Sequence, residues 1–291
     1  MPAPIPSSAQ LDAYRRRNAG RPVVLFHRFG LGADVTRAQT VTKLAALASA
    51  HRGRLRWSGT EEQVLIGVLP LYRHCARLHF ATRAAALEMV QSPAHGELFD
   101  EAGALEIAVL NEQPRGARLA MRLMALALPR WPFFDNRTDS APDPGIGTGT
   151  GIMPTQAAYD AFVAHPDPQA PVVMVNWLRF RERAEYPADT VADGEAVSGQ
   201  TAYYRYGKRA FVALHSLGAR ALFVSRYRQM LVGNGGDPGV DLWHEFAMVE
   251  YPGRAGFRRM TALRRYRAAL HHRAAGLADD GQGLLVTTTG A

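Results

Sequence analysis

The sequence predicts an α+β fold built from tandem ferredoxin-like repeats, each of order β-α-β-β-α-β, that form one intramolecular pseudo-dimeric α+β barrel. Three observations support this prediction. Strand-like and helical patterns follow that order in the second half of the chain, the same order occurs in the first half, and residues 52–67 align without a gap to residues 218–233. Because such a sheet carries helices on one face only, its other face must be buried, and a second copy can bury it. We therefore expect two sheets packed face to face with a ligand cavity between them.

The second repeat begins with the most apolar run of the chain, residues 171–178, which is typical of a central strand. Residues 201–217 are predicted to form an amphipathic helix that Gly218 ends, because apolar side chains recur there at steps of three and four residues. Further elements are predicted as strands at residues 220–226, 229–233, 242–251 and 284–288, with a second helix at residues 254–263.

The first repeat follows the same plan and sets the domain boundaries. A strand begins at Pro22-Val-Val, as the later strand begins at Pro171-Val-Val, and Asp34 is the expected cap of the next helix. We predict a first domain over residues 18–113, a linker with an apolar helix over residues 114–153, and a second domain over residues 154–291.

Three connecting segments have distinctive compositions. Residues 117–128 form an apolar helical pattern that is expected to cover an end of the barrel, with a membrane-interface helix as the alternative. The glycine-rich run at residues 145–151 follows no strand and lacks phosphate-loop spacing, so it is interpreted as linker. The polar insertion at residues 185–200 is interpreted either as a lid over a pocket of the second repeat or as padding.

Composition limits the class of protein. The 291 residues are 47% hydrophobic and 21% charged, which is typical of a globular chain of two domains. The net charge is +8, but the 34 basic residues include only two lysines, Lys43 and Lys208, and the arginines are spread along the chain without a nucleic-acid-binding motif. We therefore expect no nucleic-acid partner. No apolar run reaches the ~20 residues of a membrane span. We expect a cytoplasmic location, because there is no secretory pattern at the N-terminus and no second cysteine. We expect a monomer, because the two halves are predicted to pair within one chain.

Polar residues in apolar elements are candidates for a ligand site. His27 and Asn176 occupy aligned positions of the two first strands, where a side chain facing a cavity can act as a base or hydrogen-bond donor. Burial against a neighbouring strand is the alternative for both. Tyr203 and Tyr206 are core residues or substrate-binding residues on the helix, and Arg226 either holds an anionic oxygen or is a solvated strand end.

The aligned third strands contain a second set of candidates. Tyr72 aligns with Trp243 and His74 aligns with Glu245, so each pair shares one face of its strand. If this row faces the cavity, burial raises the pKa of Glu245 and the residue can act as a base. If the row faces outward, His244 faces the cavity instead. We assign catalytic roles to Glu245, His27 and His244, and substrate-binding roles to Tyr72, Trp243 and His74.

No metal or cofactor is predicted. His74 and His79 point to opposite faces of a strand, and the adjacent His271 and His272 point apart on a helix, so neither pair has metal-ligand spacing. Cys75 is interpreted as a small buried hydrophobic residue. No GxSxG motif occurs.

Several short motifs of the second repeat occur in a fixed order. They are Pro154-Thr155, the run PVVMVNWLRFR at residues 171–181, Tyr204-x-Tyr206-Gly207, Trp243-x-Glu245, Val249-Glu-Tyr-Pro252, Phe257-x-x-Met260 and His272-Arg273. Together they resemble a large family of small bacterial proteins of unknown function in the dimeric α+β barrel superfamily, over residues 153–289. The first half resembles a diverged member of the same superfamily. Related barrels include cofactor-independent monooxygenases, muconolactone isomerase-like enzymes, polyketide cyclases and haem-binding peroxidase-like proteins, so the resemblance implies a ligand cavity but no single reaction.

Two classes of function fit these predictions. The first is an enzyme, a monooxygenase, isomerase or cyclase without a cofactor, that acts on a hydrophobic oxygen-bearing small molecule. The second is a non-catalytic protein in which the polar side chains only orient such a ligand, or a structural barrel. A general base beside a cavity distinguishes the first from the second.

Overall fold

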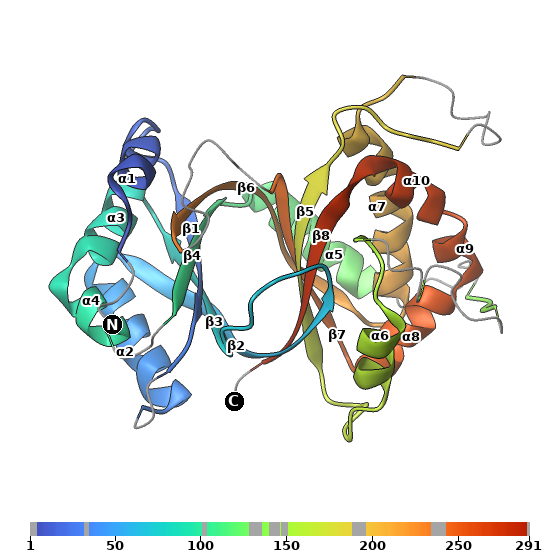
Figure 1. The fold of residues 1–291 in the computed structure, drawn as a ribbon, viewed down its shortest axis with the longest axis horizontal. Coiled ribbons are helices and arrows are strands. Elements are labelled where there is room, and N and C mark those ends of the chain that lie inside the picture. Colours follow the sequence, from blue (N-terminus) through green and yellow to red (C-terminus); the bar gives the residue numbers. More distant parts are fainter. Residues whose placement is uncertain are drawn as a thin grey trace.

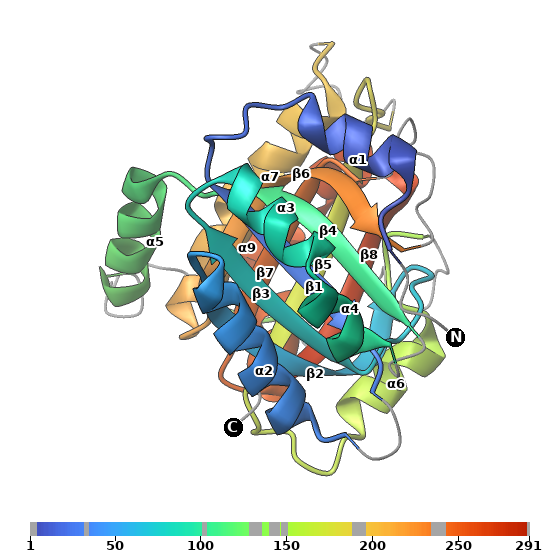
Figure 2. The ribbon, with the colours of Figure 1, turned by 90° about the vertical axis from the view of Figure 1, so that its left-hand side faces the viewer.

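The computed structural model describes residues 5–31, 35–100, 104–127, 136–139, 146, 151–187, 196–233 and 243–289. The first half forms four strands and the helices that cover them. Its elements are α1 (Ser8–Arg15), β1 (Val23–Phe29), α2 (Arg37–Ala50), β2 (Gly53–Ile66), β3 (His74–Phe80), α3 (Arg83–Gln91), α4 (Pro93–Phe99) and β4 (Leu105–Asn111). Helices α2, α3 and α4 lie across the outer face of this sheet (Figure 2).

The second half repeats this order after the connecting helices α5 and α6. Its elements are α5 (Arg115–Ala127), α6 (Gln156–Val163), β5 (Val172–Phe180), α7 (Gly199–Ser216), β6 (Arg220–Val232), β7 (Glu245–Tyr251), α8 (Arg254–Ala262), α9 (Arg264–Arg267), α10 (Leu270–Gly276) and β8 (Leu277–Thr289). The expected strands at residues 220–226 and 229–233 form one strand, β6, because alternate side chains stay buried along its whole length. Strand β8 starts seven residues earlier than the expected residue 284.

The strands of the described residues close into one antiparallel barrel in the order β1-β3-β2-β8-β5-β7-β6-β4. Each half contributes four neighbouring strands, and the pairs β2–β8 and β4–β6 join the halves. In Figure 1 the strands form a ring between two helical layers, with the helices of the first half on the left. The predicted α+β class and the predicted barrel are therefore confirmed.

The connecting segments are described in part. Helix α5 confirms the predicted apolar helix, and it projects from the side of the molecule (Figure 2). Leu119, Leu123 and Leu126 on α5 are 57–62% exposed. Asp34, the expected cap of α2, lies outside the described residues, and the side chain of Thr36 accepts the capping hydrogen bond from Gln39. Most of residues 145–151 and residues 188–195 of the predicted lid also lie outside the described part.

The interior of the barrel is filled by aromatic side chains. Phe26 packs against Trp57, Trp177 and Phe246, with ring centroids 4.8–6.3 Å apart. An eight-stranded barrel is just wide enough for side chains to fill it, and these four rings occupy the space between the two sheets. The prediction that the ligand cavity lies between the two sheets is therefore wrong.

One arginine is enclosed in the same interior. Arg28 is 1% exposed, and its Nε lies 2.7 Å from Oε1 of Glu61, whose side chain is fully buried. Glu106 accepts from the same guanidinium at 3.4 Å, and the rings of Tyr72 and Trp177 lie 4.7 and 5.2 Å from it. Because all three charges are removed from water, each depends on the others for compensation.

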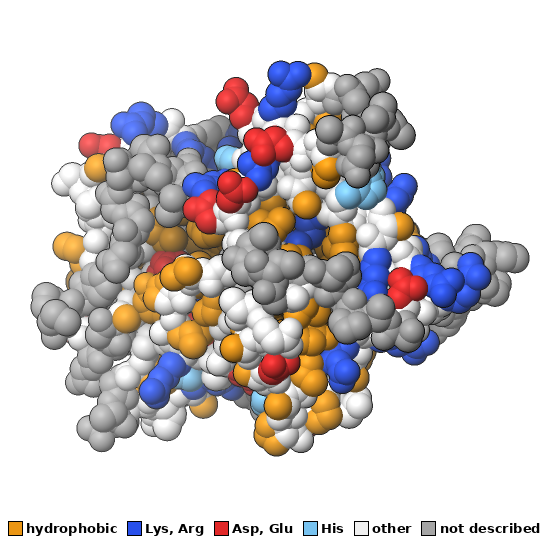
Figure 3. Space-filling view, turned by 45° about the vertical axis from the view of Figure 1, so that its right-hand side comes forward, with side chains coloured by type: hydrophobic (Ala, Val, Ile, Leu, Met, Phe, Trp, Pro, Cys, Tyr) orange, Lys and Arg blue, Asp and Glu red, His pale blue; other side chains and the backbone are white. Residues whose placement is uncertain are grey.

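Surface charges are mixed in sign. On the face shown in Figure 3, basic side chains are dispersed and several lie beside acidic ones, as expected for a solvated surface with ion pairs. Within the described part of the chain, no helix combines the length and apolarity that a bilayer crossing needs.

We predict that Glu61→Gln lowers the free energy of unfolding by about 3 kcal/mol or more, because it leaves the buried Arg28 charge without its main partner. Urea denaturation followed by circular dichroism measures this. The matched control is Asp12→Asn, which breaks an exposed pair of 3.9 Å with Arg15 and should change stability by less than about 1 kcal/mol. Equal effects of the two substitutions would contradict the dependence on burial.

Candidate functional site

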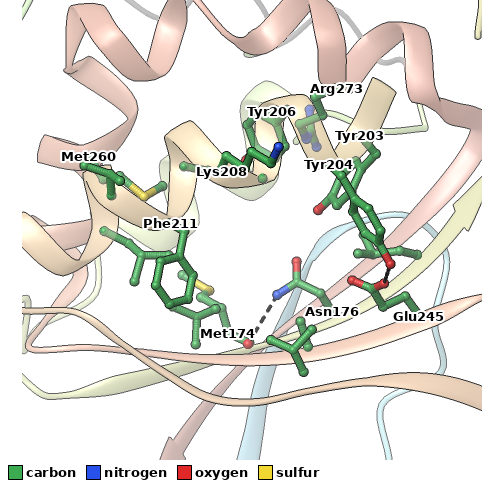
Figure 4. A pocket seen from close by; sticks show the side chains of 18 of the residues that line it. Met174, Asn176, Tyr203, Tyr204, Tyr206, Lys208, Phe211, Glu245, Met260 and Arg273 are labelled. Atoms are coloured by element: carbon green, nitrogen blue, oxygen red, sulfur yellow. Dashed lines mark hydrogen bonds between the residues drawn. The ribbon is translucent and has the colours of Figure 1, made fainter. Parts of the chain in front are cut away.

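A cavity of about 670 Å³ lies between helix α7 and the outer face of the second-half sheet. Strands β5, β7 and β8 form its floor and α7 its roof. Figure 4 shows Met174 and Asn176 of β5 on the floor and Tyr206 and Lys208 of α7 above them. Residues of α5 and α8 line it as well. The cavity is thus on the helix-facing side of the sheet and not inside the barrel.

Small side chains leave this space open. Gly207 and Ala210 face the cavity from α7, and Ala247 and Val249 face it from β7. The corresponding space of the first half is closed by large side chains, which are Phe29, Phe80, Met89 and Phe99, each at most 2% exposed. The difference in side-chain volume explains why one half has a cavity and the other does not.

A buried carboxyl group lies at one end of the cavity. Glu245, on β7, is 7% exposed, and its Oε2 accepts a hydrogen bond of 2.7 Å from the Tyr204 hydroxyl of α7 (Figure 4). Burial raises the pKa of Glu245, while the Tyr204 hydrogen bond and the Arg226 charge act to lower it. A carboxylate with a raised pKa is a stronger base than an exposed one.

Three further polar side chains form a hydrogen-bonded chain from the floor to helix α10. Nε2 of Gln282 donates to Oδ1 of Asn176 at 2.9 Å, and Arg273 of α10 donates to Oε1 of Gln282 and to the Ile152 carbonyl. Nδ2 of Asn176 makes a 3.3 Å bond to the Met174 carbonyl and has a second hydrogen. Asn176 therefore presents a fixed amide donor to the cavity.

Tyrosine hydroxyls line the roof. The Tyr206 and Tyr266 hydroxyls lie 3.0 Å apart, and burial raises the pKa of Tyr203 and of Tyr266 well above the ordinary value. These phenols stay protonated at neutral pH, so they can act as hydrogen-bond donors to a bound oxygen.

The structure brings together four of the ten predicted site residues. Glu245, Asn176, Tyr203 and Tyr206 line the cavity. Arg226 of β6 is the cross-strand partner of Glu245 in the β6–β7 register, and it is exposed. Glu245 itself faces a cavity on the helix side of the sheet, but Trp243, which was predicted to share its face, does not.

His27 and His74 lie elsewhere. Both point to the helices of the first half, and His27 is enclosed by His95, with Nε2 atoms 3.3 Å apart, and by Phe99. Burial lowers the pKa of His27 well below its ordinary value and that of His95 to about 4, so both rings are neutral. His27 matches Asn176 in orientation, but the space it faces is filled, and the prediction that it faces the cavity is wrong. The ring of His74 lies 5.9 Å from Phe29 on the same side.

The other predicted residues also point away from the cavity. Tyr72 packs on Arg28 in the barrel interior, and Trp243 packs against the aromatic cluster there because it precedes the regular part of β7. His244 is exposed, and its Nδ1 accepts from the Phe180 amide at 2.9 Å. The alternative that His244 faces the cavity is therefore wrong.

Sequence reasoning assigned no role to Tyr204, Gln282 or Arg273. Tyr204 and Arg273 stand in the motifs that carry the resemblance, which was the only sequence signal for them. The sequence contained no signal for Gln282, because β8 was expected to start after this residue.

Among the described residues, no group of three histidine, cysteine or acidic side chains is placed to hold a metal ion. The described lining of the cavity contains no histidine or cysteine, and its polar groups are tyrosine hydroxyls, amides, Lys208, Arg273 and the Glu245 carboxyl group.

A closed antiparallel barrel with helices on its outer faces defines this chain as an α+β barrel protein. It is similar to the RPA0582 protein of Rhodopseudomonas palustris, a protein of unknown function, with 30% identity over 46% of this chain and 91% of that chain and a TM-score of 0.40. The match extends over nearly the whole of that protein and over about half of this chain.

Two other solved structures are similar to this chain over most of their length. A mutant chlorite dismutase from Candidatus Nitrospira defluvii is 12% identical over 95% of this chain and 93% of that chain, with a TM-score of 0.45. An anthrone oxidase-like protein is 7% identical over 93% and 92%, with a TM-score of 0.46. No protein-family model matches the chain, and no curated protein matches it.

We predict that Tyr204→Phe raises the pKa of Glu245 further, because it removes a hydrogen bond that stabilises the carboxylate and leaves the burial in place. A ¹³C NMR titration of carboxyl-labelled glutamate, assigned with Glu245→Gln, measures the shift. Tyr251→Phe is the control, since Tyr251 lines the same cavity but donates to the Met260 sulfur. A Glu245 pKa that is unchanged or lower in Tyr204→Phe would contradict the assigned hydrogen bond.

Proposed function

We propose that the protein binds a hydrophobic, oxygen-bearing small molecule in the cavity under α7 and that Glu245 transfers a proton to or from it. The observation that supports this most directly is a buried carboxyl group, held by Tyr204, at the edge of a largely apolar cavity. A cavity of about 670 Å³ has the volume of a typical small-molecule site.

The proposed reaction is proton abstraction next to a carbonyl group. Glu245 takes the proton from carbon, and the electron pair of the C–H bond moves onto the carbonyl oxygen as an enolate. The Asn176 amide and the Tyr203 hydroxyl are the donors that would stabilise this oxygen. Where the substrate has a C=C bond next to the acidic carbon, the ion is a dienolate, and return of the proton to its γ-carbon gives the conjugated isomer, so the step balances without a cofactor.

A non-catalytic binding protein is the second candidate. The apolar lining contributed by Met174, Phe211, Met260 and α5 favours retention of a ligand by burial alone. In that case Glu245 and Asn176 fix the orientation of the ligand.

The internal repeat is also a proposal, supported by local backbone geometry. Arg52 and Gly218 precede β2 and β6 at aligned positions, with φ of 59° and 79°. Gly67 and Gly233 follow the same strands at aligned positions, also with positive φ. We propose that the halves are two ferredoxin-like units that pair within one chain, and that the chain is therefore a monomer. We also propose a cytoplasmic location, as expected from the lone cysteine.

The lid at residues 185–200 stays a prediction. Its described start is attached to α10, where the Tyr186 hydroxyl lies 2.9 Å from Nδ1 of His272, next to Arg273. Deleting residues 188–197 is expected to leave the melting temperature nearly unchanged and to reduce ligand affinity. Unchanged affinity would contradict the lid.

We predict that the protein accelerates hydrogen–deuterium exchange at the acidic α-carbon of 2-tetralone, a hydrophobic ketone used as the probe. Proton NMR in D₂O measures the rate. Glu245→Gln should reduce the accelerated rate by about 100-fold or more and leave binding intact, because it removes the base and keeps the shape. The rate should fall at low pH as the raised pKa of Glu245 is crossed and its carboxylate is protonated.

Two variants separate the candidate functions. Ala247→Phe fills the cavity from its floor and should abolish both binding and exchange, whereas Ala50→Phe, on the exposed end of α2, should change neither. Binding of 2-tetralone without accelerated exchange would favour the non-catalytic candidate. Equal behaviour of Ala247→Phe and the wild type would contradict the site.

A further inference from the structure

A second pocket, of about 800 Å³, lies at the end of the barrel where β2 begins and β3 and β4 end. Four arginines line it, Arg21 before β1 and Arg52, Arg54 and Arg56 at the start of β2. It belongs to the first half, and none of its lining residues takes part in the cavity under α7. Its function is not explained by the proposed proton transfer.

These four guanidinium groups have no ion-pair partner among the described residues. Several other arginines of the described surface are paired with carboxylates, as in the pairs Arg220–Glu250, Arg264–Asp139 and Arg181–Glu185. The one acidic side chain that lines the pocket, Glu112, is bonded to Nδ1 of His79 at 2.8 Å. The pocket therefore carries an excess of positive charge.

A fifth arginine, in the barrel interior, adds to the positive charge near the pocket. Arg77 points into the barrel interior and is 8% exposed, with its guanidinium 4.8 Å from the Phe223 ring. Its Nε has no hydrogen-bond partner in the described structure, and its charge interacts with those of Arg56 and Glu112. A buried cation this poorly compensated raises the local positive potential, which low-dielectric walls concentrate.

The backbone of one lining arginine is strained. Arg52 has a φ of 59°, a conformation that favours glycine, and the aligned position of the second half is Gly218. Glycine fits the turn at that position better than arginine, so the backbone geometry does not explain the arginine of the first half. A role for the Arg52 side chain in the pocket would explain it.

We propose that this pocket binds a multiply charged organic phosphate. Guanidinium groups match phosphate oxygens with paired N–H donors, and several of them around one concave site select a multiply charged anion. The volume exceeds that of a single phosphate group, so the site has room for an organic portion beside the phosphates.

Isothermal titration calorimetry of the full chain, with inorganic pyrophosphate and adenosine 5′-triphosphate as probes, tests this site. One molecule of probe should bind per chain in a saturable way. Arg54→Gln combined with Arg56→Gln should weaken binding by about 100-fold, roughly tenfold for each lost charged hydrogen-bond donor. Arg258→Gln combined with Arg259→Gln makes the same change of net charge on the exposed face of α8, and it should leave binding unchanged.

Two further measurements separate a loss of binding from a loss of folding and from the proposed proton transfer. Arg52→Gly should fold with an unchanged or higher melting temperature and still bind the probes more weakly. Exchange of 2-tetralone should be unaffected in the Arg54/Arg56 variant, which separates this site from the proposed proton transfer. Absence of binding at millimolar probe, or equal weakening in both double variants, would overturn the proposal. Tighter binding of a single-stranded oligonucleotide than of the triphosphate would also overturn it, in favour of a nucleic-acid surface.

Discussion

Closure of the barrel is the constraint on which the rest of the structure depends. The pairs β2–β8 and β4–β6 leave none of the eight strands with a free edge, and the inner faces of both sheets then share one narrow space. Large aromatic side chains and the enclosed Arg28 fill that space. The cavity under α7 accordingly lies on an outer face, between a sheet and its helices, and the arginine-lined pocket lies at an end of the barrel.

Strand faces could be predicted from the sequence, but the occupied side could not. Alternation correctly separated Met174 and Asn176 from Val175 and Trp177. Which face keeps an opening depends on the summed volumes of side chains from four strands and several helices, and that sum exists only after folding. The same limit explains His27, since its orientation was consistent with its partner Asn176 while Phe99 and His95 fill its surroundings.

The candidate site combines residues with very different sequence signals. Glu245 stood out as a carboxylate within an apolar strand, which is costly unless the group is satisfied or used. Tyr204 and Gln282 did not stand out, because a tyrosine on a helix and a glutamine near a turn are ordinary surface residues in sequence terms. Their meaning arises from contacts 41 and 106 positions apart in the chain, Tyr204 with Glu245 and Gln282 with Asn176.

Because only one of the two described helical layers contains a cavity, the barrel has one such binding site and not two. A barrel made from two identical chains presents the same space twice, so its two sites are related by symmetry and can influence each other through the shared sheet. Here the first layer is closed by Phe29, Phe99 and Met89, while the second stays open. Occupancy under α7 is accordingly a single event per barrel, with a hyperbolic saturation curve and no twin site to which it could be coupled.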